Sequence, residues 1–317
     1  TKPLKKFGAK FKTNLGKLPI VIEGTENPKS ITYNESKGSA QCKSSVMLAA
    51  LNTSGTTIIN ARKSRDHTEH MFKYLKVPIK ILSKKNYDLI KINGGKKIRS
   101  FNYKIPSDIS SSAFFIVLTT LTTNSKLKIK NVNINPSRVG IIKILNKMGV
   151  KIFLKNIKNY KGEKIADIYV KSTKSLKAIK CPPKLNAATI DEFLIIFLVA
   201  AKAKGVSVFK ELSELNQKES PRLKWGSKIL KLMGVKTITT NDSIKIFGNP
   251  SLTIEKKIVI NALWNQVIYS RFSSNVKIDI NKLKEEILKD NKQTEFLLSE
   301  IVFDLDLNES LDKKFIL

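Results

Sequence analysis

One pattern recurs along the chain: an apolar helical stretch, then a small polar turn, then a short β-rich segment. Apolar stretches without a polar face predict buried helices, and branched apolar residues alternating with polar ones predict strands. The helix and strand pairs are residues 45–51 with 55–59, residues 112–121 with 125–129, and residues 191–201 with 205–209. This alternation predicts an α/β architecture in which a sheet wraps each buried helix.

A second, amphipathic helical pattern follows each pair, at residues 71–77, 141–150 and 229–235. The last two patterns end alike, with Met-Gly-Val at 148–150 and at 233–235. Glycine at this position is typical of a helix end in the left-handed conformation. Strands are also predicted at 166–170 and, around a hairpin turn at Asn93-Gly94, at 87–92 and 97–101. The repeated unit is therefore a βαβαββ motif, which is too long for a solenoid repeat.

Composition narrows the class of protein. The chain has 317 residues, enough for two domains, and 41% of them are hydrophobic, which argues against intrinsic disorder. The 58 Lys and Arg residues against 26 Asp and Glu give a formal net charge of +32. Such an excess is typical of proteins that bind nucleic acid, anionic membranes or small anions. Lysine is nevertheless scattered without a block of like charges, so a compositional bias explains the excess equally well.

Several features are missing that other function classes need. The longest apolar run, residues 193–201, is shorter than the roughly 20 residues that cross a bilayer, so we expect no membrane span. No signal peptide is recognisable, although the chain lacks an initiating Met and export stays open on that ground. Cys42 and Cys181 have no CxxC spacing, which favours a reducing cytosol. His67 and His70 stand at i, i+3 without a further ligand cluster, so we expect no metal site.

Polar clusters stand where several helices begin. Residues 38–45 and 64–69 bring hydroxyls, an amide and a guanidinium to helix starts, which attract phosphate or carboxylate; ordinary capping is the alternative. Residues 107–112 are good caps, and Thr189 and Glu192 have the spacing of a capping box. Residues 214–222 either belong to the same kind of anion site or are charged residues on a solvent-exposed surface. Because such clusters recur at comparable places in successive repeats, we predict that they surround one anion-binding cleft.

Four of these segments resemble 5-enolpyruvylshikimate-3-phosphate synthases, the 3-phosphoshikimate 1-carboxyvinyltransferases. Residues 39–44 resemble the family's Ser-Ala-Gln-x-Lys-Ser element, and residues 64–69 are identical to its Ser-Arg-Asp-His-Thr-Glu element. Residues 108–111 resemble Asp-Ile-Ser-Ser, and residues 218–222 resemble Lys-Glu-Ser-Asp-Arg with Pro221 in place of Asp. The likeness runs from residue 1 to about residue 250 in the family's order. The elements at 64–69 favour this branch over the related UDP-N-acetylglucosamine enolpyruvyl transferases.

The resemblance implies a two-domain fold, an inside-out α/β barrel in which each domain has three βαβαββ units. We expect a hinge near Asn135-Pro136, with residues 1–134 forming a partial first domain and residues 135–317 the second. The family's N-terminal loop elements have no counterpart before Thr1, and residues 256–317 diverge, without the family's Asp-His-Arg element. We therefore expect a fragment that carries only part of the active site and turns over slowly or not at all.

The resemblance also implies a reaction: the enolpyruvyl group of phosphoenolpyruvate moves to the 5-hydroxyl of shikimate 3-phosphate, and phosphate is released, in aromatic amino-acid biosynthesis. No metal or organic cofactor is expected, because the enol phosphate already carries the activation. A cytoplasmic monomer is expected. The alternative from another class is a non-catalytic basic scaffold that binds nucleic acid or other polyanions, although aromatic and basic residues are not interleaved as stacking platforms require.

Site residues follow from the same resemblance. Asp191 is expected to act as the base on the 5-hydroxyl, facing Glu219 across the cleft, and Lys218 and Glu219 to relay protons at the enolpyruvyl carbon. Arg222 would clamp phosphoenolpyruvate. Ala40 supplies no hydroxyl, so a second contact of that kind to the phosphate is lost. The residues expected to line the shikimate 3-phosphate site are Ser39, Ala40, Gln41, Ser64 and Arg65.

Overall fold

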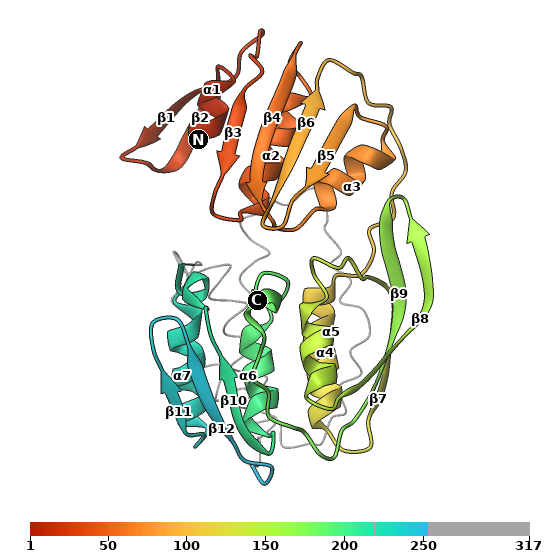
Figure 1. Ribbon diagram of the computed structural model, residues 1–317, viewed down its shortest axis with the longest axis vertical. Helices are drawn as coiled ribbons and strands as arrows, with labels where there is room; N and C mark the ends of the chain where they lie inside the picture. The colour runs from red at the N-terminus through yellow and green to blue at the C-terminus, as the bar shows by residue number, and fades with distance from the viewer. Residues whose placement is uncertain (218–219, 253–317) are drawn as a thin grey trace, which may run out of the picture. The chain divides into compact units, whose positions relative to one another are not determined.

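A computed structural model describes residues 1–217 and 220–252 of the chain. All of the described residues belong to one compact unit. The predicted divergence concerns residues 256–317, which lie outside the described residues. Within the described residues, helices and strands alternate as the sequence predicted (Figure 1).

The first repeat consists of a four-stranded sheet and two helices. The sheet has the order β3-β4-β6-β5, in which β3 runs parallel to β4 and the other neighbours are antiparallel. Helix α2 packs on this sheet, and α3 joins β4 to β5 (Figure 1). In chain order the elements are β3 (Thr32–Glu35), α2 (Ala40–Ala50), β4 (Thr56–Arg62), α3 (His67–Tyr74), β5 (Ile79–Ser83) and β6 (Tyr87–Asn93).

Two further repeats have the same order of elements. Their sheets, β7-β9-β8 and β10-β12-β11, place the last strand between the other two, as β6 lies between β4 and β5. The second repeat has α4 (Ile109–Leu121), β7 (Lys126–Asn133), α5 (Gly140–Lys147), β8 (Lys151–Tyr160) and β9 (Glu163–Lys171). The third has α6 (Phe193–Ala201), β10 (Gly205–Phe209), α7 (Arg222–Leu232), β11 (Thr237–Thr239) and β12 (Ile244–Gly248). Parallel bridges at Ser107, Lys177 and Lys180 stand where β3 stands in the first repeat, which confirms the βαβαββ unit.

The predicted helix ends are confirmed. Gly149 follows α5 with a φ of +91°, and Gly234 follows α7 with a φ of +77°. These left-handed values are strained for a residue with a Cβ, which explains why glycine recurs there. After α3 the same position is occupied by Lys76, with a φ of +55°. At the N-terminus, α1 (Lys2–Lys6) ends before Gly8, and β1 (Lys10–Asn14) pairs with β2 (Lys17–Glu23).

Two hydrophobic cores fill the described part of the chain. The first runs from Phe7 to Ile92 and the second from Ile109 to Ile246. The change of core falls earlier than the hinge expected near residue 135, because α4 and β7 contribute to the second core; the domain boundary at 134/135 stays a prediction. Burial is complete along α6 except at Leu194, whereas α2 and α4 leave large side chains exposed at Leu48, Phe115 and Leu118.

The predicted strand at residues 97–101 is wrong. Strand β6 already pairs with β4 on one side and β5 on the other, so no edge is left for a hairpin partner. Residues 94–106 carry no helix or strand. Gly94 instead lies so close to the end of α2 that a Cβ there would stand 2.2 Å from the carbonyl oxygen of Thr53. The glycine serves a close backbone approach, and the turn that we predicted from Asn-Gly does not form.

Candidate active site

The first polar cluster lies at the start of α2. Ser39 is the N-cap residue, and its Oγ accepts a hydrogen bond from the backbone N–H of Cys42 at 3.2 Å. The preceding loop is held by Glu35, a buried carboxylate that accepts from the N–H groups of Lys37 at 3.0 Å and Gly38 at 2.7 Å. Because its cap is satisfied, α2 begins at Ala40, five residues earlier than the apolar pattern predicted.

The second cluster follows β4. Ser64 Oγ is buried and has no hydrogen-bond partner among the described residues. Buried hydroxyls are nearly always partnered, so an unpartnered one at a cavity wall indicates a place for a polar ligand or water. The next residue, Arg65, directs its guanidinium to Asp191, with which it forms a short hydrogen bond and ion pair.

Asp191 lies between two arginines. Its Oδ2 accepts from Arg65, and its Oδ1 accepts from Arg222 Nη1 at 3.0 Å. The three side chains retain between 16% and 28% of their exposure, so the cluster is accessible to small solutes. The structure thus joins residues of three separate predicted elements around one carboxylate. Lys218 and Glu219 lie outside the described residues, so their predicted place opposite Asp191 stays untested.

The predicted capping box at the start of α6 is wrong. Thr189 Oγ1 donates to the carbonyl of Leu185 at 2.8 Å, and the helix begins at Phe193 without a side-chain cap. Glu192 turns into the protein, where it is 2% exposed, and accepts a short hydrogen bond from Ser110. Burial raises the pKa of Glu192 to about 6; the nearby Asp191 adds to the rise, and the hydrogen bond from Ser110 opposes it.

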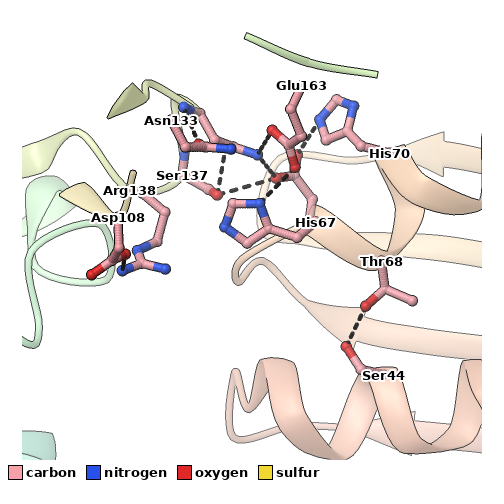
Figure 2. A network of polar contacts seen from close by, with 11 residues as sticks. Ser44, His67, Thr68, His70, Asp108, Asn133, Ser137, Arg138 and Glu163 are labelled. Carbon is pink, nitrogen blue, oxygen red and sulfur yellow. Dashed lines mark hydrogen bonds and ion pairs between the residues drawn. The ribbon is translucent and has the colours of Figure 1, made fainter. Parts of the chain in front are cut away.

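Residues 108–111 cap α4, as their composition favoured. Asp108 Oδ2 accepts from the backbone N–H of Ser111 at 2.8 Å. Arg138 donates to Asp108 at 2.9 Å (Figure 2). It also donates to Ser110 Oγ at 2.6 Å. Ser110 thus links a surface ion pair to the buried carboxyl of Glu192, a role that capping does not need.

Both histidines of the chain bind carboxylates (Figure 2). His67 Nδ1 lies 2.6 Å from Glu163 Oε1, and His70 Nε2 lies 3.3 Å from Asp66 Oδ2. The buried amide of Asn135 donates to Asp66 at 2.8 Å and to Glu163 at 3.2 Å. This network ties the start of α3 to the segment after β7 and to the start of β9. Among the described residues, no group of three or more His, Cys, Asp or Glu side chains could hold a metal ion.

The two carboxyls of this network are held in their ionised forms. Burial opposes ionisation of Asp66, but the hydrogen bond from Asn135 and the charge of His70 bring its pKa below the usual value. Burial likewise opposes ionisation of Glu163, and the hydrogen bond and charge of His67 lower its pKa. The network therefore stabilises the folded chain where these carboxyls are charged.

A cavity of about 1450 Å³ brings together five of the predicted substrate residues, whereas Asp191 and Arg222 do not line it. Ser39, Ala40, Gln41, Ser64 and Arg65 all contribute to its wall. Its remaining cationic wall residues are Lys37, Arg62, Lys63, Lys85 and Lys184. Four carboxylates, Glu35, Glu211, Glu214 and Asp242, also line it, so the wall carries a moderate excess of positive charge, which together with its hydrogen-bond donors suits an anionic ligand.

The contact between Lys43 and Glu69 was not predicted from the sequence, although both residues belong to the motifs at 39–44 and 64–69. Both are buried, and Lys43 Nζ lies 2.6 Å from Glu69 Oε1. The sequence did contain a pattern that indicates burial of Lys43, because this residue has the helical spacing of the buried residues Val46, Met47 and Ala50. A lysine on the buried face of a helix predicts a buried partner. The sequence offered no comparable signal for Arg138.

The repeated units are those of enolpyruvyl transferases. The enolpyruvyl transferase NikO from Streptomyces tendae superposes with a TM-score of 0.58 over 78% of this chain and 57% of its own; at 15% identity the likeness shows the fold alone. EPSP synthase from Acinetobacter baumannii gives a TM-score of 0.69 at 38% identity, over 78% of this chain and 55% of its own. The model of the family described as EPSP synthase (3-phosphoshikimate 1-carboxyvinyltransferase) matches residues 1–258, and the chain belongs to that family.

Curated relatives agree with this assignment. A 3-phosphoshikimate 1-carboxyvinyltransferase of Ruthia magnifica subsp. Calyptogena magnifica is 39% identical over 258 residues, which cover 80% of this chain. One of Bacillus subtilis (strain 168) is 36% identical over 255 residues. The chain spans about 58% of the length of both relatives. The predicted family and fold are confirmed, and nothing in these matches supports the alternative of a nucleic-acid-binding scaffold. No helix in the described part of the chain is long and apolar enough to cross a membrane.

Proposed function

We propose that this chain supplies part or all of a 3-phosphoshikimate 1-carboxyvinyltransferase site, which moves the enolpyruvyl group of phosphoenolpyruvate to the 5-hydroxyl of shikimate 3-phosphate. The observation that carries this proposal is the cluster in which Asp191 lies between Arg65 and Arg222. Arg65 also lines the cationic cavity. A carboxylate bound to a guanidinium of the cavity wall and to a second guanidinium combines a base with binding groups for two anionic substrates.

Shikimate 3-phosphate is proposed to bind where the two polar clusters meet the cavity. The hydroxyls of Ser39 and Ser64, the amide of Gln41 and the guanidinium of Arg65 would hold its phosphate and hydroxyls. The unpartnered Ser64 Oγ supports this assignment, because a ligand oxygen would satisfy it. Ala40 lines the same cavity without a hydroxyl, so the phosphate has one donor fewer at that point.

For catalysis, we propose that Asp191 removes the proton of the 5-hydroxyl as that oxygen bonds to the enol carbon of phosphoenolpyruvate, and that a separate acid protonates the methylene carbon. The proposed acid and relay, Lys218 and Glu219, stand four and three residues before Arg222 in the sequence. Arg222 would clamp phosphoenolpyruvate, and phosphate would leave from the tetrahedral adduct as the Lys218–Glu219 relay takes one proton from the new methyl group, which restores the C=C bond. Substrate anions would then compete with Asp191 for the guanidinium groups that bind it in this structure.

The test is calorimetric titration of the chain with shikimate 3-phosphate. We expect saturable binding, and we expect Arg65→Ala to lose a charge-assisted contact worth roughly 1.5 to 3 kcal/mol. Arg99→Ala, on the exposed segment after β6, is the matched control and should bind like the parent. If the parent chain gives no binding heat at millimolar ligand, or if Arg65→Ala binds with unchanged affinity, the proposed site is wrong.

We also propose that the protein works in the cytoplasm as a monomer. Cys42 and Cys181 are both free thiols in the structure, which supports a reducing compartment. Size-exclusion chromatography with light scattering tests the monomer, and fractionation of cells tests the location.

A further inference from the structure

Two neighbouring residues on α2 contact two neighbouring residues on α3. Lys43 Nζ lies 2.6 Å from Glu69 Oε1, with side chains 1% and 6% exposed. The hydroxyls of Ser44 and Thr68 are 2.7 Å apart (Figure 2). All four residues lie in the first two turns of their helices. The starts of α2 and α3 are thus joined by an ion pair and a hydrogen bond.

Stability alone is a poor explanation for the Lys43–Glu69 pair. Taking both charges out of water is costly, and well-packed apolar residues often stabilise a protein as much as a buried ion pair or more. Lys43 also stands in the first turn of α2, where the helix dipole disfavours a cation. Glu69 Oε2 is buried and has no hydrogen-bond partner among the described residues, which leaves the pair only partly satisfied.

What the pair does fix is the relative position of two segments that line the cavity. Ser39 and Gln41 lie at the start of α2, directly before Lys43 in the chain. Ser64 and Arg65 lie just before α3, which carries Glu69 in its first turn. Neither Lys43 nor Glu69 contributes to the cavity wall itself, so the pair acts from behind it.

We propose that Lys43 and Glu69 are positioning residues, which hold these two segments at the separation that lets one ligand contact both. This inference rests on the proposed binding of shikimate 3-phosphate. A ligand that touches both segments depends on their separation, whereas inorganic phosphate, bound by one of them, depends on it much less. The pair therefore affects affinity for the large ligand more than affinity for the small one.

The experiment replaces both charges by apolar side chains of similar size, Lys43→Met with Glu69→Leu. Thermal unfolding, and calorimetric titration with shikimate 3-phosphate and with inorganic phosphate, are compared with the parent. We expect a melting temperature within a few degrees of the parent, a dissociation constant for shikimate 3-phosphate at least about tenfold higher, and a smaller change for inorganic phosphate. Lys10→Met with Glu23→Leu removes an exposed ion pair between β1 and β2 and is the control.

Glu69→Asp is a second variant, in case the apolar pair does not fold. It keeps both charges and shortens one arm by a methylene, so it should fold and weaken binding of shikimate 3-phosphate by at least threefold. A folded variant of either kind that binds shikimate 3-phosphate within twofold of the parent overturns the inference, as does an equal loss for both ligands. Failure of the parent chain itself to bind shikimate 3-phosphate would refute the proposed function instead. The two failures are distinguishable, because only the second is seen in the parent chain.

Discussion

Glu192 offers a quantitative test of how burial acts on this fold. Its pKa in the folded chain is about 6, against an ordinary value of 4.5. Each pH unit of that difference corresponds to about 1.36 kcal/mol, so ionised Glu192 costs the folded state about 2 kcal/mol relative to the unfolded chain. Between pH 4.5 and 6 the folded state holds the proton and the unfolded chain releases it. The stabilising contribution of Glu192 is therefore present below pH 4.5 and is lost as the pH rises through 6.

The Glu192→Gln variant removes this dependence. Glutamine has nearly the same shape, is neutral at every pH, and can still accept the hydrogen bond from Ser110. We expect its advantage over the parent in free energy of unfolding to be about 2 kcal/mol larger at pH 8 than at pH 4. Urea denaturation followed by circular dichroism at several pH values measures this, and other titrating groups cancel because both proteins contain them. Glu23→Gln, on the exposed strand β2, controls for loss of a carboxyl without burial. A Glu192→Gln advantage that stays constant over this pH range would refute the reasoning.

Three other outcomes are expected. In any form of the chain that releases phosphate from its substrates, Asp191→Asn should lower the rate of phosphate release by more than about a hundredfold, because the amide keeps the shape and loses the base. A rate within threefold of the parent would exclude Asp191 as the base. The pKa values of Asp66 and Glu163 are lowered in the folded chain, so their contribution is present above about pH 4.5 and is lost as the pH falls through the folded values. Glu163→Gln should therefore flatten the fall of the melting temperature below about pH 4.5. Gly234→Ala should destabilise by roughly 1 kcal/mol in urea denaturation, from backbone strain alone, because no atom lies within 4 Å of the added Cβ.

Much of the fold could be predicted because the same order of helices and strands occurs several times along the chain. The Met-Gly-Val endings at Gly149 and Gly234 identified two helix ends that a single occurrence would not have distinguished from a turn. The apolar run of residues 193–201 gave α6 because every turn of that helix is buried except at Leu194. Where the local pattern was ambiguous, pairing decided: Asn93-Gly94 favours a hairpin locally, yet both edges of β6 were already taken.

The sequence predicted which residues belong to the site, but not the contacts that they make with one another. Motif resemblance placed Ser39, Ser64 and Arg65 at one substrate site; all three line one cavity, and their roles as substrate ligands stay a prediction. The contact of Arg65 with Asp191 joins residues far apart in the chain, and no periodicity reports such a contact. Glu192 illustrates the same limit, because its spacing from Thr189 satisfies a local capping rule while its real partner is on α4.

The two hydrophobic cores share no buried side chain, so apolar packing by itself does not require the repeats to unfold together. Polar contacts between the repeats supply that requirement, since Arg65 with Asp191 and His67 with Glu163 each join a residue of the first repeat to a later one. Salt and acid weaken these polar contacts. They should therefore reduce the cooperativity of unfolding between the two cores more than they reduce the stability of either core. Hydrogen exchange would then separate into two protection classes at low pH. An anion that binds Arg65 and Arg222 together should restore a single protection class, because it binds only when both cores are folded.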